Sequence, residues 1–261
     1  MPNWCSNALT VYGPTKDADS FHEAIKDGDD YDLTLPHPTP DILVGTTSPP
    51  STHENVEKLR ARRDAGECKA HDGHPGPLSE NGSWVTDEYL AEMHAAVDLS
   101  IAAKKETGYP DWYMWNIANW GTKWSPDVHD DVLVDVHEDT TSIRMQFDSA
   151  WAPPEVLVST LSEKWPTLTF ILDYSEPGMD FYGASAWKAG ISHYDNTQEY
   201  GDDPMLQALQ TKMDALYELD NEGDGLTEAQ WQEESRLQGE IHDRHNDLHA
   251  MIAGAAEVAV S

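Results

Sequence analysis

The order of patterned segments along this chain of 261 residues limits its fold more than any other feature. Alternating or continuous apolar runs indicate strands, and capped stripes at helical spacing indicate helices. Strands are expected at 5–12, 130–137, 142–148 and 167–174, and helices near 15–27 and 153–164. With the long stretch between the first helix and the second strand set aside, the order is strand, helix, strand, strand, helix, strand. This order predicts an α+β fold, the ferredoxin-like split βαβ sandwich, with an antiparallel sheet and both helices on one face.

The segments outside this pattern divide the chain further. A Pro- and Thr-rich stretch and a Gly- and Pro-rich stretch predict loops between short helices, and therefore a long helical and loop insertion. Near the end of the chain, two apolar stripes joined by a Gly-rich loop predict an αα-hairpin. We therefore expect a ferredoxin-like domain at 1–190 (core 1–28 and 129–190, insertion 29–128), a polar linker at 191–204 and a C-terminal helical hairpin at 205–261.

Acidic residues dominate the charge of the chain. There are 48 Asp and Glu against 16 Lys and Arg, which gives a formal net charge of −32. Such a surface repels phosphate backbones and anionic lipid, so nucleic acid and membrane are not expected as partners. The acid is spread along the chain, as in a protein kept dissolved by its charge or adapted to a salty cytoplasm. An acidic mimic of nucleic acid remains an alternative.

Cysteine usage and the N-terminus bear on location. The two cysteines, Cys5 and Cys68, are too few for a disulfide framework. The N-terminus lacks the basic and apolar regions of a secretory signal peptide. No apolar run reaches the roughly 20 residues that span a bilayer. A cytoplasmic protein is expected, in the host cell if the chain is viral.

Tryptophan is concentrated in one segment. Four of the 10 tryptophans lie between Trp112 and Trp124, together with Lys123. Each such side chain can bury on the order of 150–250 Å². Either the rest of the fold or a partner must therefore cover them.

Several motifs recur in the order known from one family. They are Pro2-Asn3-Trp4-Cys5-Ser6-Asn7, Leu35-Pro36-His37-Pro38, Asn119-Trp120-Gly121-Thr122-Lys123-Trp124, Phe147-Asp148-Ser149-Ala150-Trp151-Ala152-Pro153-Pro154, and Tyr174-Ser175-Glu176 followed by Phe181-Tyr182-Gly183. Over residues 1–44 and 109–190 the chain resembles the phage- and plasmid-borne family with a ferredoxin-like domain, the Api/YubB type. The resemblance implies the fold and an origin on a mobile element. It implies no agreed activity, cofactor or catalytic residue.

The motifs suggest one candidate binding site. Four tryptophans, Trp4, Trp120, Trp124 and Trp151, are expected to lie near one another if the first strand pairs in the centre of the sheet. One interpretation is an aromatic core closed by the stem of Lys123. The other is a recognition pocket in which Lys123 and Arg144 meet an anionic group and Glu176 or Asp148 orients it.

Metal sites are weaker alternatives, and no cofactor is predicted. Cys68, His71 and His74 offer ligands for zinc at short spacing. The stretch Asp220–Trp231 resembles a calcium loop, but Trp231 stands where the bidentate Glu should be. His242, His245 and His249 share one face of the last predicted helix, which we interpret as a solvated polar face.

The chain carries no phosphate loop, nucleophile elbow or zinc-protease helix. A non-enzymatic accessory protein of a virus or mobile element is therefore favoured, one that binds a host or viral macromolecule, most simply a protein. The alternatives are a small-molecule or nucleotide-binding protein or enzyme with a Trp-rich pocket around Lys123, and the acidic mimic. The oligomeric state is left open.

Overall fold

The structure, a computed structural model, describes residues 3–69, 83–129, 132–222 and 226–260, and for 219–222 the backbone alone. The chain forms two compact units, one of residues 1–37 and 120–261 and one of residues 38–119. The strands of the first unit are β1 (Trp4–Pro14), β2 (Lys26–Asp27), β3 (Asp30–Tyr31), β4 (Asp127–Val128), β5 (Leu133–His137), β6 (Thr140–Ala150), β7 (Thr169–Glu176), β8 (Phe181–Lys188) and β9 (Ile191–Glu199). Its helices are α1 (Thr15–Ala24), α6 (Glu155–Lys164), α7 (Pro204–Glu222) and α8 (Glu228–Ala259), with the 3₁₀ turns η1 (Pro177–Met179) and η2 (Tyr200–Asp202).

The main sheet has the predicted topology. Its strands follow the order β4-β6-β1-β7-β8-β9, with β5 also paired to β6, and every pair is antiparallel. Within it, β5, β6, β1 and β7 form the split βαβ arrangement, in which β1 lies between two strands that follow it much later in the chain. The ferredoxin-like α+β prediction is therefore confirmed.

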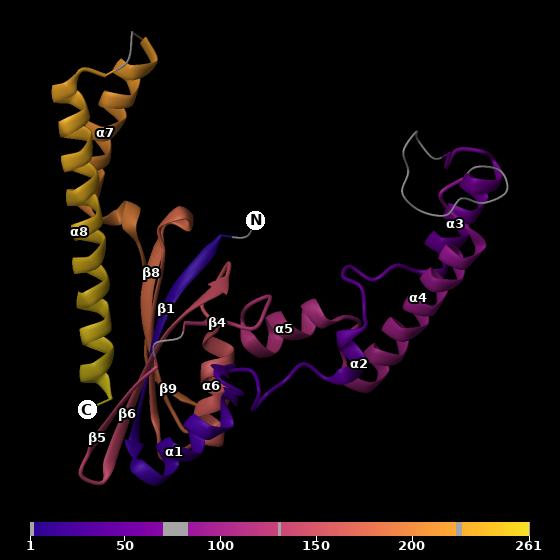
Figure 1. Cartoon of the computed structure of the whole chain (residues 1–261), viewed down its shortest axis with the longest axis horizontal. Helices are drawn as coiled ribbons and strands as arrows, with labels where there is room; N and C mark the ends of the chain where they lie inside the picture. The colour runs from indigo at the N-terminus through magenta and orange to yellow at the C-terminus, as the bar shows by residue number, and fades with distance from the viewer. Residues whose placement is uncertain (1–2, 70–82, 130–131, 223–225, 261) are drawn as a thin grey trace. The chain divides into compact units, whose positions relative to one another are not determined.

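One face of the sheet carries the core that the apolar alternation predicts. Every second residue of β1 from Cys5 to Val11 is buried, and the register sets these positions opposite buried residues of β6 and β7. Helices α1 and α6 contribute the other side of this core. Phe21 of α1 meets Phe170 of β7 edge to face, with ring centroids 5.4 Å apart. The two helices lie on the same side of the sheet, as predicted (Figure 1).

The opposite face is covered by the C-terminal helix. Ile171 follows Phe170 in β7 and therefore points to the other side of the sheet. It belongs to a buried cluster that joins β7 and β8 to α8, namely Ile171, Tyr182, Ala184, Ala186, Tyr200, Leu206, Leu248, Ile252 and Ala256. Figure 1 shows α8 along this side of the sheet. The hairpin of α7 and α8 thus belongs to the same compact unit as the sheet.

Two segments differ from their predicted structure. The expected linker at 191–204 holds a strand, β9, which extends the sheet beyond β8. Its side chains are mostly polar and exposed, so the segment lacks the alternation of apolar and polar residues that predicts a strand. Helix α1 ends at Ala24, because residues 26–31 form the small hairpin of β2 and β3.

The second unit is helical. It contains α2 (Asp41–Val44), α3 (His53–Asp64), α4 (Asp87–Thr107) and most of α5 (Trp112–Trp120). Side chains of Thr52 and Thr86 cap α3 and α4 through the backbone N–H groups three residues later. A small core of Val56, Cys68, Val85, Leu90 and Val97 joins them.

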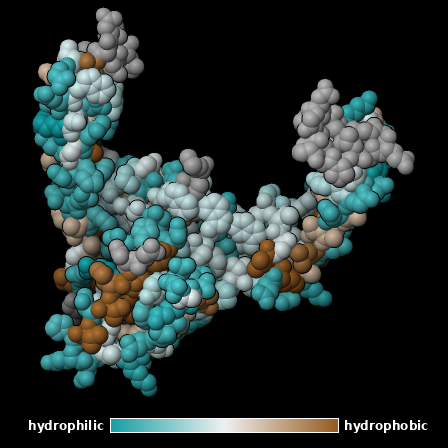
Figure 2. Space-filling view, viewed as in Figure 1, coloured by the Kyte–Doolittle hydropathy of each residue, from teal (hydrophilic) through white to brown (hydrophobic). Residues whose placement is uncertain are grey.

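Strand β5 is exposed on both sides. Leu133, Val134 and Val136 are 58%, 42% and 63% exposed, and Figure 2 shows the apolar patch over this strand. None of the described helices combines the length and the apolar character needed to cross a membrane.

Candidate functional site

The Trp-rich segment folds into α5 and the turn that follows it. The carboxylate of Asp111 accepts a hydrogen bond from the backbone of the first turn of α5. Trp115 and Trp120 are buried, and the indole N–H of Trp120 donates to the carbonyl oxygen of His37 over 2.9 Å. Gly121 ends the helix with φ +82°, a left-handed conformation that glycine adopts without strain. Trp115 and Trp120 therefore belong to the packed interior, which is the role that the aromatic-core interpretation gives to Trp120.

The loop after Gly121 leaves two of its side chains, those of Lys123 and Trp124, partly or fully exposed. Thr122 is fully buried, and its hydroxyl donates to the carbonyl oxygen of Ala150 over 2.9 Å. This bond fixes the loop that contains Thr122 against the end of β6. It thereby positions the side chains of Lys123 and Trp124. The ring of Trp124 lies 6.1 Å from that of Trp4, and the Lys123 ammonium lies 4.3 Å from the centre of the Trp124 ring. Trp4 and Trp124 remain 46% and 38% exposed.

A third exposed tryptophan stands at the same end of the sheet. Trp151 follows Ala150, which is the residue of β6 paired with Trp4. Its backbone N–H donates to the carbonyl oxygen of Asn3 over 3.0 Å, and its side chain is 44% exposed. We call the group of Trp4, Lys123, Trp124 and Trp151 the aromatic surface.

Arg144 lies away from the aromatic surface. It sits on β6 opposite Thr10 and Leu133, with its side chain exposed. At about 3.3 Å per residue, its position is on the order of 20 Å along the strand from Ala150. The structure does not bring Arg144 together with Lys123.

Glu176 is engaged in a turn. Its side chain is 6% exposed and accepts a hydrogen bond from the backbone N–H of Met179, which caps η1. A side chain at Gly178 would lie only 3.0 Å from the carboxylate, so the turn is built closely around it. Asp148 lies on β6, where its carboxylate accepts a hydrogen bond from Ser6 and lies 3.5 Å from His129.

A buried polar network lies on the core side of the same strands. The side-chain amide of Asn7 donates to the carbonyl oxygens of Cys5 and Phe147 and to the hydroxyl of Ser149. Burial raises the pKa of the Cys5 thiol to about 12. Since the thiolate is the reactive form, Cys5 is suited to packing and not to nucleophilic chemistry.

The structure describes only some of the candidate metal ligands. Cys68 is buried, while His71 and His74 lie outside the described residues. The first half of the calcium-like loop, 220–225, also lies outside the part whose side chains are described, and Thr227 at its eighth position caps α8. Among the described residues, no group of three or more His, Cys, Asp or Glu is placed to hold a metal ion.

The histidines of α8 differ from the predicted solvated face. His245 packs against Tyr200, with ring centroids 4.1 Å apart, and His249 lies 3.1 Å from Asp173 of β7. Only His242 of the three is exposed. Because α8 packs on the sheet, the helix face with His245 and His249 is turned toward the rest of the unit. The pattern of the helix alone does not indicate this.

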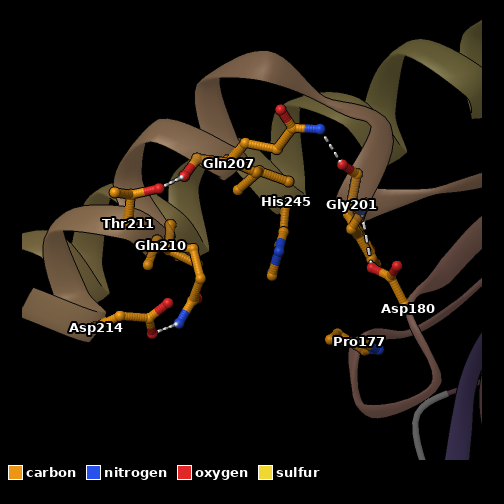
Figure 3. Close-up of a pocket in the computed structure, with 11 residues that line it drawn as sticks. Pro177, Asp180, Gly201, Gln207, Gln210, Thr211, Asp214 and His245 are labelled. Carbon is orange, nitrogen blue, oxygen red and sulfur yellow. Dashed lines mark hydrogen bonds between the residues drawn. The ribbon is translucent and has the colours of Figure 1, made fainter. Parts of the chain in front are cut away.

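A cavity of about 410 Å³ lies beside His245 and was not predicted (Figure 3). The residues that line it come from three distant segments, 177–180, 200–214 and 241–245. The sequence patterns predict a linker at 200–204 and a helical hairpin at 205–214 and 241–245. No local motif marks the cavity, because only the docking of the hairpin on the sheet creates it.

A comparison with protein-family models agrees with the fold. Residues 119–222 match a family model described as the ferredoxin-like domain in Api92-like protein. Among solved structures, the chain is similar to the crystal structure of a protein api92 from Yersinia pseudotuberculosis, with 16% identity, a TM-score of 0.40, and coverage of 78% of this chain and 100% of that one. No curated protein matches the chain. Residues 119–222 thus carry the signature of the ferredoxin-like domain in Api92-like proteins.

Proposed function

We propose that this chain is a non-enzymatic accessory protein of a virus or other mobile element, and that it binds a host or viral protein through the aromatic surface. The observation that carries the proposal is the exposure of Trp4, Trp124 and Trp151 at one end of the sheet. Tryptophan is enriched at the energetic centres of protein interfaces, because it buries a large area and loses little conformational freedom. A partner that covered these rings would remove apolar area from water.

The charge of the chain favours a protein as the partner. The net charge of −32 opposes approach to nucleic acid or anionic lipid. Lys123 adds a positive charge beside the Trp124 ring, so a partner with an acidic group next to an apolar hollow fits this surface best. The two buried cysteines are compatible with the reducing cytoplasm, where we place the protein.

The test compares variants of the aromatic surface with a matched exposed tryptophan elsewhere. The double variant Trp4→Ala/Trp124→Ala removes the ring pair, Lys123→Met removes the ammonium and keeps its stem, and Trp231→Ala removes a ring of α8 that is 53% exposed. Each tagged protein is purified from its native cells, and the captured proteins and small molecules are quantified by mass spectrometry.

We expect one protein partner to be lost with the double variant, weakened with Lys123→Met and retained with Trp231→Ala. Interface tryptophans commonly contribute more than about 2 kcal/mol, so the loss should exceed tenfold. Equal capture by all variants would refute the proposal. A partner released by salt but indifferent to the tryptophans would instead favour the acidic mimic, and a retained nucleotide would favour the small-molecule alternative.

A further inference from the structure

The cavity beside His245 is bounded by both helices of the C-terminal hairpin and by η1 and η2. Its lining is Pro177, Asp180, Tyr200, Gly201, Leu206, Gln207, Gln210, Thr211, Asp214, Ile241 and His245. The volume of about 410 Å³ falls within the range of small-molecule sites, about 300–1,000 Å³. A ligand of modest size could therefore enter it.

One wall of the cavity is aromatic. Tyr182 stacks on Tyr200 with ring centroids 4.5 Å apart, and Tyr200 in turn meets His245 at 4.1 Å. Burial lowers the pKa of His245, so its ring is neutral at pH 7. A neutral ring against a tyrosine offers a π surface that attracts cations and accommodates methylene groups.

The hydrogen-bond donors of the lining are largely used inside the protein. The N–H of Gly201 donates to Asp180, the amide of Gln207 to the carbonyl of Gly201, the amide of Gln210 to Asp214, and the hydroxyl of Thr211 to the carbonyl of Gln207. An ionised carboxylate has about four acceptor positions, so each aspartate keeps unused ones. The lining thus has surplus acceptors, and it suits a ligand that brings donors.

The two carboxylates stand apart. Figure 3 shows Asp180 and Asp214 on opposite sides of His245, whose ring points into the space between them. Apolar side chains of Leu206 and Ile241 also line the cavity. Among the described residues of the lining, none is Lys or Arg, so nothing there would neutralise a phosphate or carboxylate.

We propose that this cavity binds an aliphatic polyamine. One ammonium group donates to Asp180 and another to Asp214, while the methylene chain between them lies along the His245 ring and the side chains of Leu206 and Ile241. Charge-assisted hydrogen bonds at both ends match the terminal ammonium groups of such a molecule, and the π surface of Tyr200 and His245 between them accommodates its methylene groups and attracts any inner ammonium. This proposal is independent of the partner that the aromatic surface binds.

The test must separate this cavity from general attraction to an acidic protein. Spermidine is titrated into the full chain by calorimetry at physiological salt, where diffuse attraction is screened. Asp180→Asn and Asp214→Asn remove a carboxylate from the cavity. Asp202→Asn in η2 and Glu218→Gln in α7 remove the same charge from exposed positions outside the lining.

We expect one saturable site per chain, a loss of about tenfold in affinity with each cavity variant, and less than about twofold with each control. Hexylamine, which has one ammonium group, should bind about tenfold more weakly than spermidine. NMR signals of the His245 ring should shift on titration. This last readout holds even if Asp180→Asn disturbs the turn at Gly201.

Three results would overturn the proposal. Absence of saturable binding by the wild-type chain is the first. Equal weakening by the cavity variants and the controls is the second, because it would mean attraction to the acidic surface alone. Equal binding of hexylamine and spermidine is the third, since a second carboxylate would then have no part.

Discussion

Helices α1 and α6 cover one face of the sheet from β6 across to β9, whereas α8 lies on the other face mainly over β7, β8 and β9, with Tyr12 of β1 packed against the same cluster. The uncovered part, on β1 and β6, carries Ser6, Ala8 and Thr10 beside Arg144, Gln146 and Asp148. The difference is visible in the strands themselves. Strand β1 alternates buried residues with exposed or partly exposed ones, but β7 is buried without a break from Thr169 to Leu172. A continuous apolar run marks a strand covered on both faces.

The largest effect should come from the fully covered face. Phe170→Ala removes a ring that is completely buried and in contact with Phe21, and it should lower the free energy of unfolding by about 3–5 kcal/mol. Urea unfolding followed by circular dichroism measures the change. Phe170→Leu should cost less, because it leaves a smaller cavity. A loss below about 1 kcal/mol for the alanine variant would mean that this face is not the main core.

The face under α8 should respond next. Ile252→Ala should cost about 2–3 kcal/mol, because the side chain is 5% exposed within the cluster between α8 and the sheet. The adjacent Met251, 68% exposed, is a matched control, and Met251→Ala should stay within about 0.5 kcal/mol. If both variants behaved alike in urea unfolding, the docking of α8 on the sheet would be in doubt.

The carboxyl group of Glu155, beside the face that α1 and α6 cover, offers a test through pH. Burial raises the pKa of Glu155 at the start of α6, the hydroxyl of Ser185 opposes this, and the charge of Asp195 adds to it. The folded state thus holds the proton more tightly than the unfolded state. Stability should fall as pH rises from the ordinary value of 4.5 through the raised value.

Glu155→Gln removes the free-energy cost of ionising a partly buried carboxyl group. Its melting temperature should exceed that of the wild type at pH 7, and the two should converge at a pH below 4.5, where the carboxyl is neutral in both states. Thermal melts across this range measure the difference. A variant that is less stable than the wild type at pH 7 would show that the ionised carboxylate is needed in place.

The smallest effect is expected on the uncovered part of the second face. Arg144→Ala removes an exposed side chain of β6 and should change the free energy of unfolding by no more than about 0.5 kcal/mol. Urea unfolding of the purified chain checks this value. A decrease in the free energy of unfolding of more than about 1 kcal/mol would show that another part of the protein packs against this area.

Local pattern was sufficient for the ferredoxin-like core. The alternation in β1 and β6 and the stripes of α1 and α6 define their own faces, and antiparallel pairing follows from their order. Strand β9 was missed because its polar residues alternate without an apolar face. The stripe of α8 predicts an αα-hairpin but does not indicate that the helix has two packing partners: Leu237 packs on α7, while Leu248 and Ile252 pack on the sheet.

The candidate site was predictable where its residues are neighbours in the sequence or where the expected order of the strands brings them together. Lys123 and Trp124 lie on one loop, and Trp4 reaches them because β1 is central, as expected. Arg144 is expected beside Lys123 as a second cation for an anionic group, but the register of β6 places it far along the strand. The cavity at His245 depends on three segments docking together, and no spacing in the sequence encodes that.

The hydrogen bond between the Trp120 indole and the His37 carbonyl joins the two points where residues 38–119 leave and rejoin the first unit. When the ends of a segment are held together by the body they leave, the segment can be lengthened, shortened or exchanged for another without moving any strand of the sheet. Insertions are tolerated best where the two ends of the inserted segment lie close together, as they do at this junction. Relatives with different inserted segments could share this sheet, and a short loop from His37 to Trp120 would give the reduced form.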